Sequence, residues 1–125
     1  MVYCGSPDAE FNYMEGFAFL NESRKKQFIA LMKEADVLPV YCEGDDEICL
    51  RAGIVSDGRI LASICKIGID PLDSVKLYLS KKTERISMLT AKGEEKQLEF
   101  EKIAENLYEI KQKAETMRPL VLLIG

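Results

Sequence analysis

The stretch RAGIVSDGRILASICKIGIDPLDSVKLYL, residues 51–79, decides the fold class. Two apolar-rich segments flank the short polar break at 56–58, and Asp70-Pro71 precedes a third segment. Within each segment the apolar residues occupy alternate positions, which is the period of a half-buried β-strand. The break contains Asp-Gly, a pair that suits the positive φ angles of a tight hairpin turn. The stretch therefore predicts a β-meander.

The two-residue period continues on both sides of the meander as far as Ile124. The runs predicted as strands are 48–55, 60–65, 75–80, 85–88, 97–100, 107–110 and 120–124. Short strands separated by frequent turn signals are typical of sandwiches. We therefore expect a mainly β protein, an antiparallel β-sandwich of about seven strands with one N-terminal α-helix. The last run is apolar throughout, which suits a strand covered on both faces.

One segment, EEKQLEFEKIAENLYEIKQK at residues 94–113, leaves two interpretations open. Read as a helix, it places Leu98, Ile103, Leu107 and Ile110 near one stripe. Read as strands, it alternates at Leu98 and Phe100. We prefer the strands because this alternation is clean.

The first 36 residues differ from the rest. A helix is predicted at 22–35, because Asn21 suits an N-cap and apolar residues follow at spacings of three and four. We expect 1–36 to form an aromatic-rich segment and helix, with the tail of a preceding domain as the alternative, and 37–125 to form the sandwich. Dense exposed aromatic residues are rare on monomers. We therefore predict an interface with an upstream domain or a homodimer partner at Phe11, Tyr13, Phe17 and Phe19.

Composition excludes several classes of function. The chain has 125 residues, enough for one domain, and 47% of them are hydrophobic. Its net charge of -4 argues against nucleic acid and anionic membrane surfaces as partners, because both are bound by clustered Lys and Arg. No apolar run approaches the roughly 20 residues that span a bilayer. The N-terminus lacks the basic start and apolar block of a signal peptide, which predicts a cytoplasmic location.

The residues offer little catalytic chemistry. The chain has no histidine, which removes the commonest general base and the Ser-His and Cys-His pairs. Carboxylates are abundant, but nothing selects a pair for glycoside hydrolysis. No phosphate-binding glycine motif is found, and we predict no cofactor and no enzyme activity in this chain.

Three weaker candidates for binding follow from single features. Tyr78 lies on the face opposite Val75 and Leu77, where it is a candidate sugar contact, and Arg51 is a candidate ligand-binding residue on its own strand. The acidic loop Glu43, Asp45, Asp46 and Glu47 is a weak calcium candidate, although solvation explains it more simply. We assign no metal to it.

The four cysteines, Cys4, Cys42, Cys49 and Cys65, include no CxxC pair. Buried free thiols in a reducing compartment explain them most simply, since Cys49 and Cys65 fall inside predicted strands. A disulfide or a cysteine metal site is the alternative.

Several short motifs resemble a known family. They are Leu38-Pro39-Val40-Tyr41, Arg51-Ala52-Gly53, Asp57-Gly58-Arg59, Ile67-Gly68-Ile69-Asp70-Pro71-Leu72 and Pro119-Leu120-Val121-Leu122. Together they resemble the C-terminal β-sandwich of bacterial β-galactosidase-like glycoside hydrolases over residues 38–125. The resemblance implies a non-catalytic accessory domain that packs or assembles, because the catalytic carboxylates of such enzymes belong to an upstream barrel. A carbohydrate- or small-ligand-binding module is the alternative.

Overall fold

The structure, a computed structural model, describes residues 22–44 and 47–125. Contacts divide the chain between Ala35 and Asp36 into two units. The first unit contains helix α2 (Glu22–Glu34), which ends one residue earlier than predicted. Lys25 pairs with Glu22 at 3.4 Å in its first turn. The predicted N-cap Asn21 lies outside the described residues.

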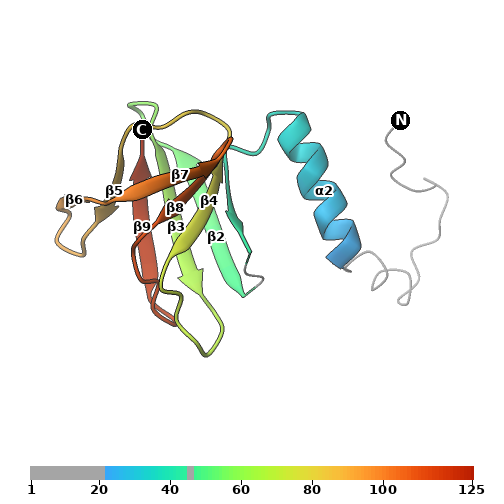
Figure 1. Cartoon of the computed structure of the whole chain (residues 1–125). Coiled ribbons are helices and arrows are strands. Elements are labelled where there is room, and N and C mark those ends of the chain that lie inside the picture. The colour runs from blue at the N-terminus through green and yellow to red at the C-terminus, as the bar shows by residue number, and fades with distance from the viewer. Residues whose placement is uncertain (1–21, 45–46) are drawn as a thin grey trace. The chain divides into compact units, whose positions relative to one another are not determined.

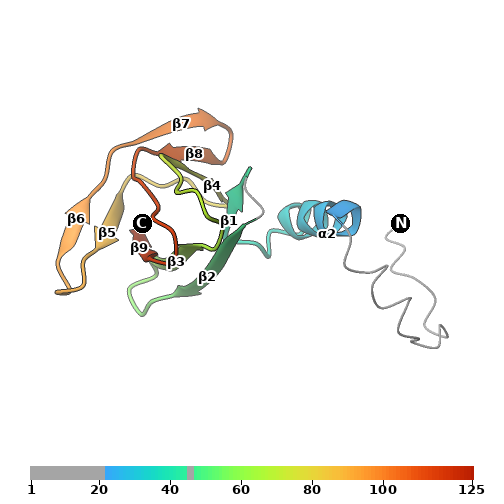
Figure 2. The same ribbon diagram turned by 90° about the horizontal axis from the view of Figure 1, so that it is seen from below.

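The second unit contains two antiparallel sheets, which confirms the mainly β, sandwich-like prediction (Figure 1). The order of strands is β1-β4-β8-β7 in the four-stranded sheet and β2-β3-β9-β5-β6 in the five-stranded sheet. Figure 2 shows the two layers facing each other, with β1 close to β2 at one end. The strands are β1 (Val40–Glu43), β2 (Ile48–Ile54), β3 (Ile60–Lys66), β4 (Val75–Leu79), β5 (Ile86–Leu89), β6 (Glu95–Gln97), β7 (Phe100–Ala104), β8 (Leu107–Ile110) and β9 (Pro119–Ile124).

The described chain therefore has nine strands where the sequence predicted about seven. The preference for strands over a helix at 94–113 is confirmed, but the single strand predicted at 97–100 is wrong. The chain leaves the five-stranded sheet after Gln97 and enters the other sheet at Phe100. Leu98 and Phe100 both face the shared core, so their alternation looks the same whether the strand continues or crosses between layers.

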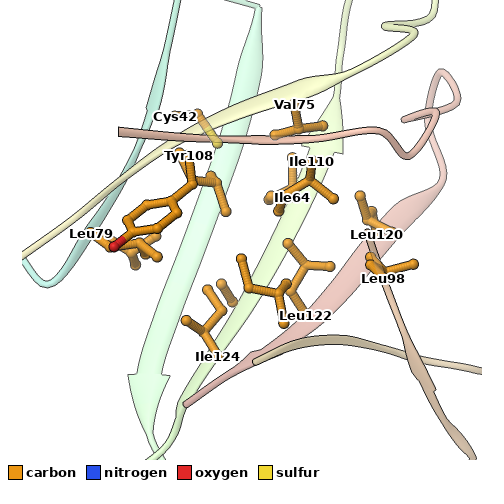
Figure 3. Close-up of a cluster of buried hydrophobic side chains, with 14 of the residues drawn as sticks. Cys42, Ile64, Val75, Leu79, Leu98, Tyr108, Ile110, Leu120, Leu122 and Ile124 are labelled. Atoms are coloured by element: carbon orange, nitrogen blue, oxygen red, sulfur yellow. The ribbon is translucent and has the colours of Figure 1, made fainter. Parts of the chain in front are cut away.

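One apolar core fills the space between the sheets. Figure 3 shows side chains from both layers meeting there, with Tyr108 beside Leu79. The Tyr108 ring packs edge-on against Phe100, with the ring centroids 5.9 Å apart. Strand β9 lies in the middle of its sheet, and Leu123 on its outer face is also buried, which agrees with the prediction of a strand covered on both sides. The largest fully buried residues are Ile64, Leu77, Leu79, Ile86, Ile110, Leu122 and Val75.

The hairpin between β2 and β3 sets the register on which the candidate site depends. Gly58 adopts a φ of 86°, and its N–H donates to the carbonyl of Val55 at 2.9 Å. A positive φ is easily reached by glycine because it has no Cβ. The predicted Asp57-Gly58 turn is thus present. It pairs Ile54 with Ile60, and the register continues without a shift to the pair of Ile48 with Lys66.

Candidate functional site

Strands β1, β2, β6 and β7 form the four sheet edges of the described residues. Exposed edges can recruit another strand, and proteins usually blunt them with short length, charge or bulges. Three of these edges carry such features. β6 has only three residues, β1 has four, and β7 carries Glu101 and Lys102 followed by a register irregularity.

The remaining edge, β2, lacks this protection. It is seven residues long, ICLRAGI, with Arg51 as its single charge. All of its residues from Arg51 to Ile54 are exposed, and Ile54 is 73% exposed although it is apolar. A long apolar edge of this kind presents an unpaired row of backbone donors and acceptors.

Hydrogen bonds at both ends of the hairpin show which backbone groups of β2 face outward. The N–H of Val55 donates to the backbone carbonyl of Arg59 at 2.9 Å, and the N–H of Ile67 donates to the backbone carbonyl of Glu47 at 2.8 Å. Residues of an antiparallel strand alternate between bonding the neighbour and pointing away from it. Odd-numbered residues of β2 therefore bond β3. The even-numbered ones, Ile48, Leu50, Ala52 and Ile54, direct their N–H and C=O groups away from it.

Cys49 and Cys65 face each other across this hairpin. They are register partners on β2 and β3, and Arg51 is paired with Ser63 two positions further along. Cys49 is exposed and Cys65 is partly exposed, whereas Cys42 is buried. The prediction of buried thiols therefore holds for Cys42 and is wrong for Cys49. The cause is that Cys49 lies on the outer face of β2, which the other strands of the second unit leave uncovered.

The two ligand-binding residues predicted from the sequence do not form one site. Arg51 lies on β2 of the five-stranded sheet, whereas Tyr78 lies on β4 of the four-stranded sheet. Tyr78 is instead the register partner of Tyr41, and both rings are half-buried. The sequence did not suggest Tyr41, because the short strand β1 was missed. A sugar contact at Tyr78 stays a prediction.

Lys66 is buried at the end of β3, where its side chain is only 5% exposed. Its Nζ lies 2.9 Å from Oε2 of Glu47, whose side chain is 66% exposed. Gly68 passes close beside this pair, and a Cβ at that position would lie 2.7 Å from the Lys66 Nζ and clash with the Glu47 carboxylate. Glu47 thus forms an ion pair with Lys66. The other acidic residues of the predicted calcium loop include Asp45 and Asp46, which lie outside the described residues. The described residues contain no group of three or more potential metal ligands.

A second charged cluster lies at the other end of the hairpin. Nε of Arg59 is 2.8 Å from Oδ2 of Asp57, and its NH1 is 3.0 Å from Oε1 of Glu95. NH2 of Arg85 lies 3.6 Å from Oε2 of Glu95. The backbone N–H and the guanidinium of Arg59 lower the pKa of Asp57, and the carboxylates of Glu95 and Asp57 raise the pKa of Arg59. All these groups are hydrated, so the cluster orders the surface of the hairpin more than it stabilises the fold.

We expect replacement of Asp57 by Asn to flatten the acid side of the stability profile. The folded-state pKa of Asp57 lies below the ordinary value of 3.8, so its carboxylate contributes stability above that pH and loses it as the pH falls through the folded value. Asn also suits the turn and accepts the Arg59 N–H. Urea unfolding of both proteins at several pH values measures this. The difference in free energy of unfolding should be constant near neutral pH and shrink below 3.8; a constant difference down to pH 2 contradicts the prediction.

Exposed apolar residues are also found near the C-terminal end of β3, next to Lys66. Ile67 and Ile69 follow β3, and Thr116 donates through Oγ1 to the carbonyl of Ile69 at 3.0 Å. Met117, 70% exposed, has a φ of 57° and donates its N–H to Lys66. Positive φ is unusual for such a side chain. Three exposed apolar residues, Ile67, Ile69 and Met117, therefore lie in the segments next to the end of β3.

Comparisons with known proteins give no family for the chain. No family model, curated protein or solved structure matches it. The resemblance to β-galactosidase-like domains stays a prediction. No helix within 22–44 or 47–125 has the length and apolar character needed to cross a bilayer. The aromatic interface predicted at Phe11, Tyr13, Phe17 and Phe19 falls outside the described residues.

Proposed function

We propose that this chain is a non-catalytic β-sandwich domain that acts in packing or oligomer assembly, and that the edge of β2 makes the contact. The observation that supports this most strongly is the contrast among the edges. β2 alone among the four described edges combines length, low charge and exposed apolar side chains. Backbone pairing along such an edge provides affinity without a pocket.

The occupant we propose is β2 of a second copy, running antiparallel about a two-fold axis. Such an axis perpendicular to the sheet keeps each side chain on its own face, so it must lie between the two strands, midway between two copies of the same residue. Because the outward-facing backbone groups belong to even-numbered residues, an axis at Ala52 pairs Ala52 with itself through two hydrogen bonds.

The side chains favour this register. An axis at Ala52 places exposed Ile54 across from Leu50 of the partner subunit, on the face where Leu50 already touches the core. It also places Arg51 across from Gly53 of the partner subunit, which leaves room for the long side chain. An axis at Arg51 would instead set two guanidinium groups directly opposite each other, which is destabilising. The two five-stranded sheets would then form one continuous sheet.

We also propose, from the sequence resemblance alone, that the domain belongs to a glycoside-hydrolase-like protein. The fold is compatible with that origin, because an antiparallel sandwich suits an accessory domain. Fold similarity does not determine function, so the assembly role rests on the β2 edge and not on the resemblance.

Sedimentation equilibrium of the full chain over a range of concentrations tests the proposal. We expect a dimer that Ala52→Pro weakens at least tenfold, about 1.4 kcal/mol, because proline removes the outward-facing N–H at the axis. The β2–β3 ladder should survive, since proline is tolerated at solvent-facing positions of edge strands. Ile54→Lys should weaken the dimer similarly.

Ile103→Lys provides the matched control, because Ile103 is also an exposed apolar residue on an edge strand, β7. It should leave the dimer unchanged, and circular dichroism should show the same fold in all variants. A monomer at the highest soluble concentration, or equal dissociation by Ile54→Lys and Ile103→Lys, would overturn the proposal.

A further inference from the structure

The register of the β2–β3 hairpin places two thiols where they can react with each other. Cys49 and Cys65 are direct partners, and the hydrogen bonds at both ends of the hairpin make theirs a hydrogen-bonded pair. The Cα atoms of such a pair are about 5.5 Å apart, within the range of about 4.4–6.8 Å found in disulfides. The backbone therefore needs no large movement to join them.

From this geometry we infer that Cys49 and Cys65 form a reversible oxidation site, a dithiol that a small-molecule disulfide converts into a cross-strand disulfide. The inference goes beyond the assembly role and does not depend on it. Cβ atoms of directly opposed residues lie about 4.5–5.5 Å apart, slightly more than the roughly 3.5–4.5 Å of a relaxed disulfide. Closing that gap strains the bond, and strained disulfides are the readily reduced ones.

The position of β2 at the sheet edge makes the closing movement feasible. Among the described strands β2 pairs with β3 alone, so in the monomer β2 can shift toward Cys65. The Cys65 thiol donates a long hydrogen bond, 4.0 Å, to the carbonyl of Lys66. On the other side of Cys65 the register partner is Pro119 of β9, which carries no competing thiol.

The exposures of the two thiols set the order of reaction. Cys49 is exposed, so its thiolate attacks one sulfur of an oxidant RSSR; that S–S bond breaks and one RS⁻ leaves and takes up a proton. The Cys65 thiolate then attacks the sulfur of Cys49 in the mixed disulfide and expels the second RS⁻. In total the two cysteines lose two electrons and two protons, and RSSR is reduced to two RSH.

Arg51 favours an anionic oxidant such as glutathione disulfide. It lies two positions from Cys49, so its side chain leaves the same face of the strand. Its register partner Ser63 is uncharged, which leaves the guanidinium charge unopposed by that neighbour. A positive charge beside the entry thiol raises the local concentration of an anionic reagent.

Peptide mass spectrometry of the full chain incubated with glutathione disulfide tests the inference. We expect a Cys49–Cys65 linked peptide that has lost two hydrogen atoms and that dithiothreitol fully restores. Cys65→Ser should abolish the link and leave the glutathione adduct on Cys49 as the end product. Cys49→Ser should also abolish the link and slow the reaction at Cys65.

Cys42→Ala is the matched control, since Cys42 is buried in the core, and it should keep the link. Three results would overturn the inference: an unmodified pair after exhaustive treatment, a wild-type reaction that stops at the Cys49 adduct, or a link from Cys49 to another cysteine. Every readout is a covalent mass, so a loss of dimerisation in the same variants would bear on the assembly proposal alone.

Discussion

Replacing Leu122 by alanine should lower the free energy of unfolding by about 3 kcal/mol, within the 2–5 kcal/mol range for buried leucines. Leu122 is fully buried on β9, the middle strand of the larger sheet, and Figure 3 shows it in the centre of the core. Truncation removes contacts from both sheets at once and leaves a cavity, because strands held on both sides relax poorly. Urea unfolding followed by circular dichroism measures the change.

Val121→Ala is the matched control, because Val121 is the preceding residue on the same strand and faces the other side. Val121 is only half-buried, so its truncation should cost about 1 kcal/mol. Equal losses from Val121→Ala and Leu122→Ala would contradict the assignment of the core to the space between the sheets. With a typical domain stability of about 5–15 kcal/mol, Leu122→Ala should still fold.

The β2–β3 hairpin was predictable from its residues because its signals agree. The period of two, the Asp57-Gly58 pair and the apolar face all require the same turn. Once that turn is fixed, Cys49 and Cys65 lie eight residues on either side of Asp57, so their pairing was available from the sequence. It was missed because each thiol was considered alone, as a small apolar residue within its strand.

The exposure of β2 was not available from the sequence. Whether β2 lies at an edge depends on which strands pair with it, and a strand as short as the four-residue β1 gives no clear periodic signal. The order of strands is likewise set by long-range pairing, such as β5 with β9. Alternation reports which face a residue occupies; it does not report which strand lies beside it.

The burial of Lys66 is the clearest difference between what the local sequence pattern predicts and what the structure shows. At the end of a strand a lysine is normally exposed, and here it is buried, because Glu47 and the chain around Gly68 close over it. Its aliphatic stem lies on the inward-facing side of β3, in step with Ile64. The stem, more than the charge, should therefore determine its contribution to stability.

Lys66→Ala should destabilise the fold by about 2–3 kcal/mol, because it removes the three buried methylenes of the stem beyond Cβ. Lys66→Met keeps most of that volume and removes only the ammonium, and replacing a buried charge by an apolar side chain is often neutral or stabilising. The Glu47 side chain is already 66% exposed, so the replacement leaves no carboxylate buried. We therefore expect Lys66→Met to unfold within about 1 kcal/mol of the wild type.

Denaturant unfolding of the two variants at neutral pH, in low and high salt, distinguishes stem from charge. If the stem dominates, Lys66→Ala is much less stable than Lys66→Met at both salt concentrations, since burial of apolar atoms is not screened. If instead Lys66→Met is as unstable as Lys66→Ala, the pair with Glu47 stabilises the end of β3 through its charge. That result would also make Gly68→Ala strongly destabilising, because a Cβ there displaces the Glu47 carboxylate.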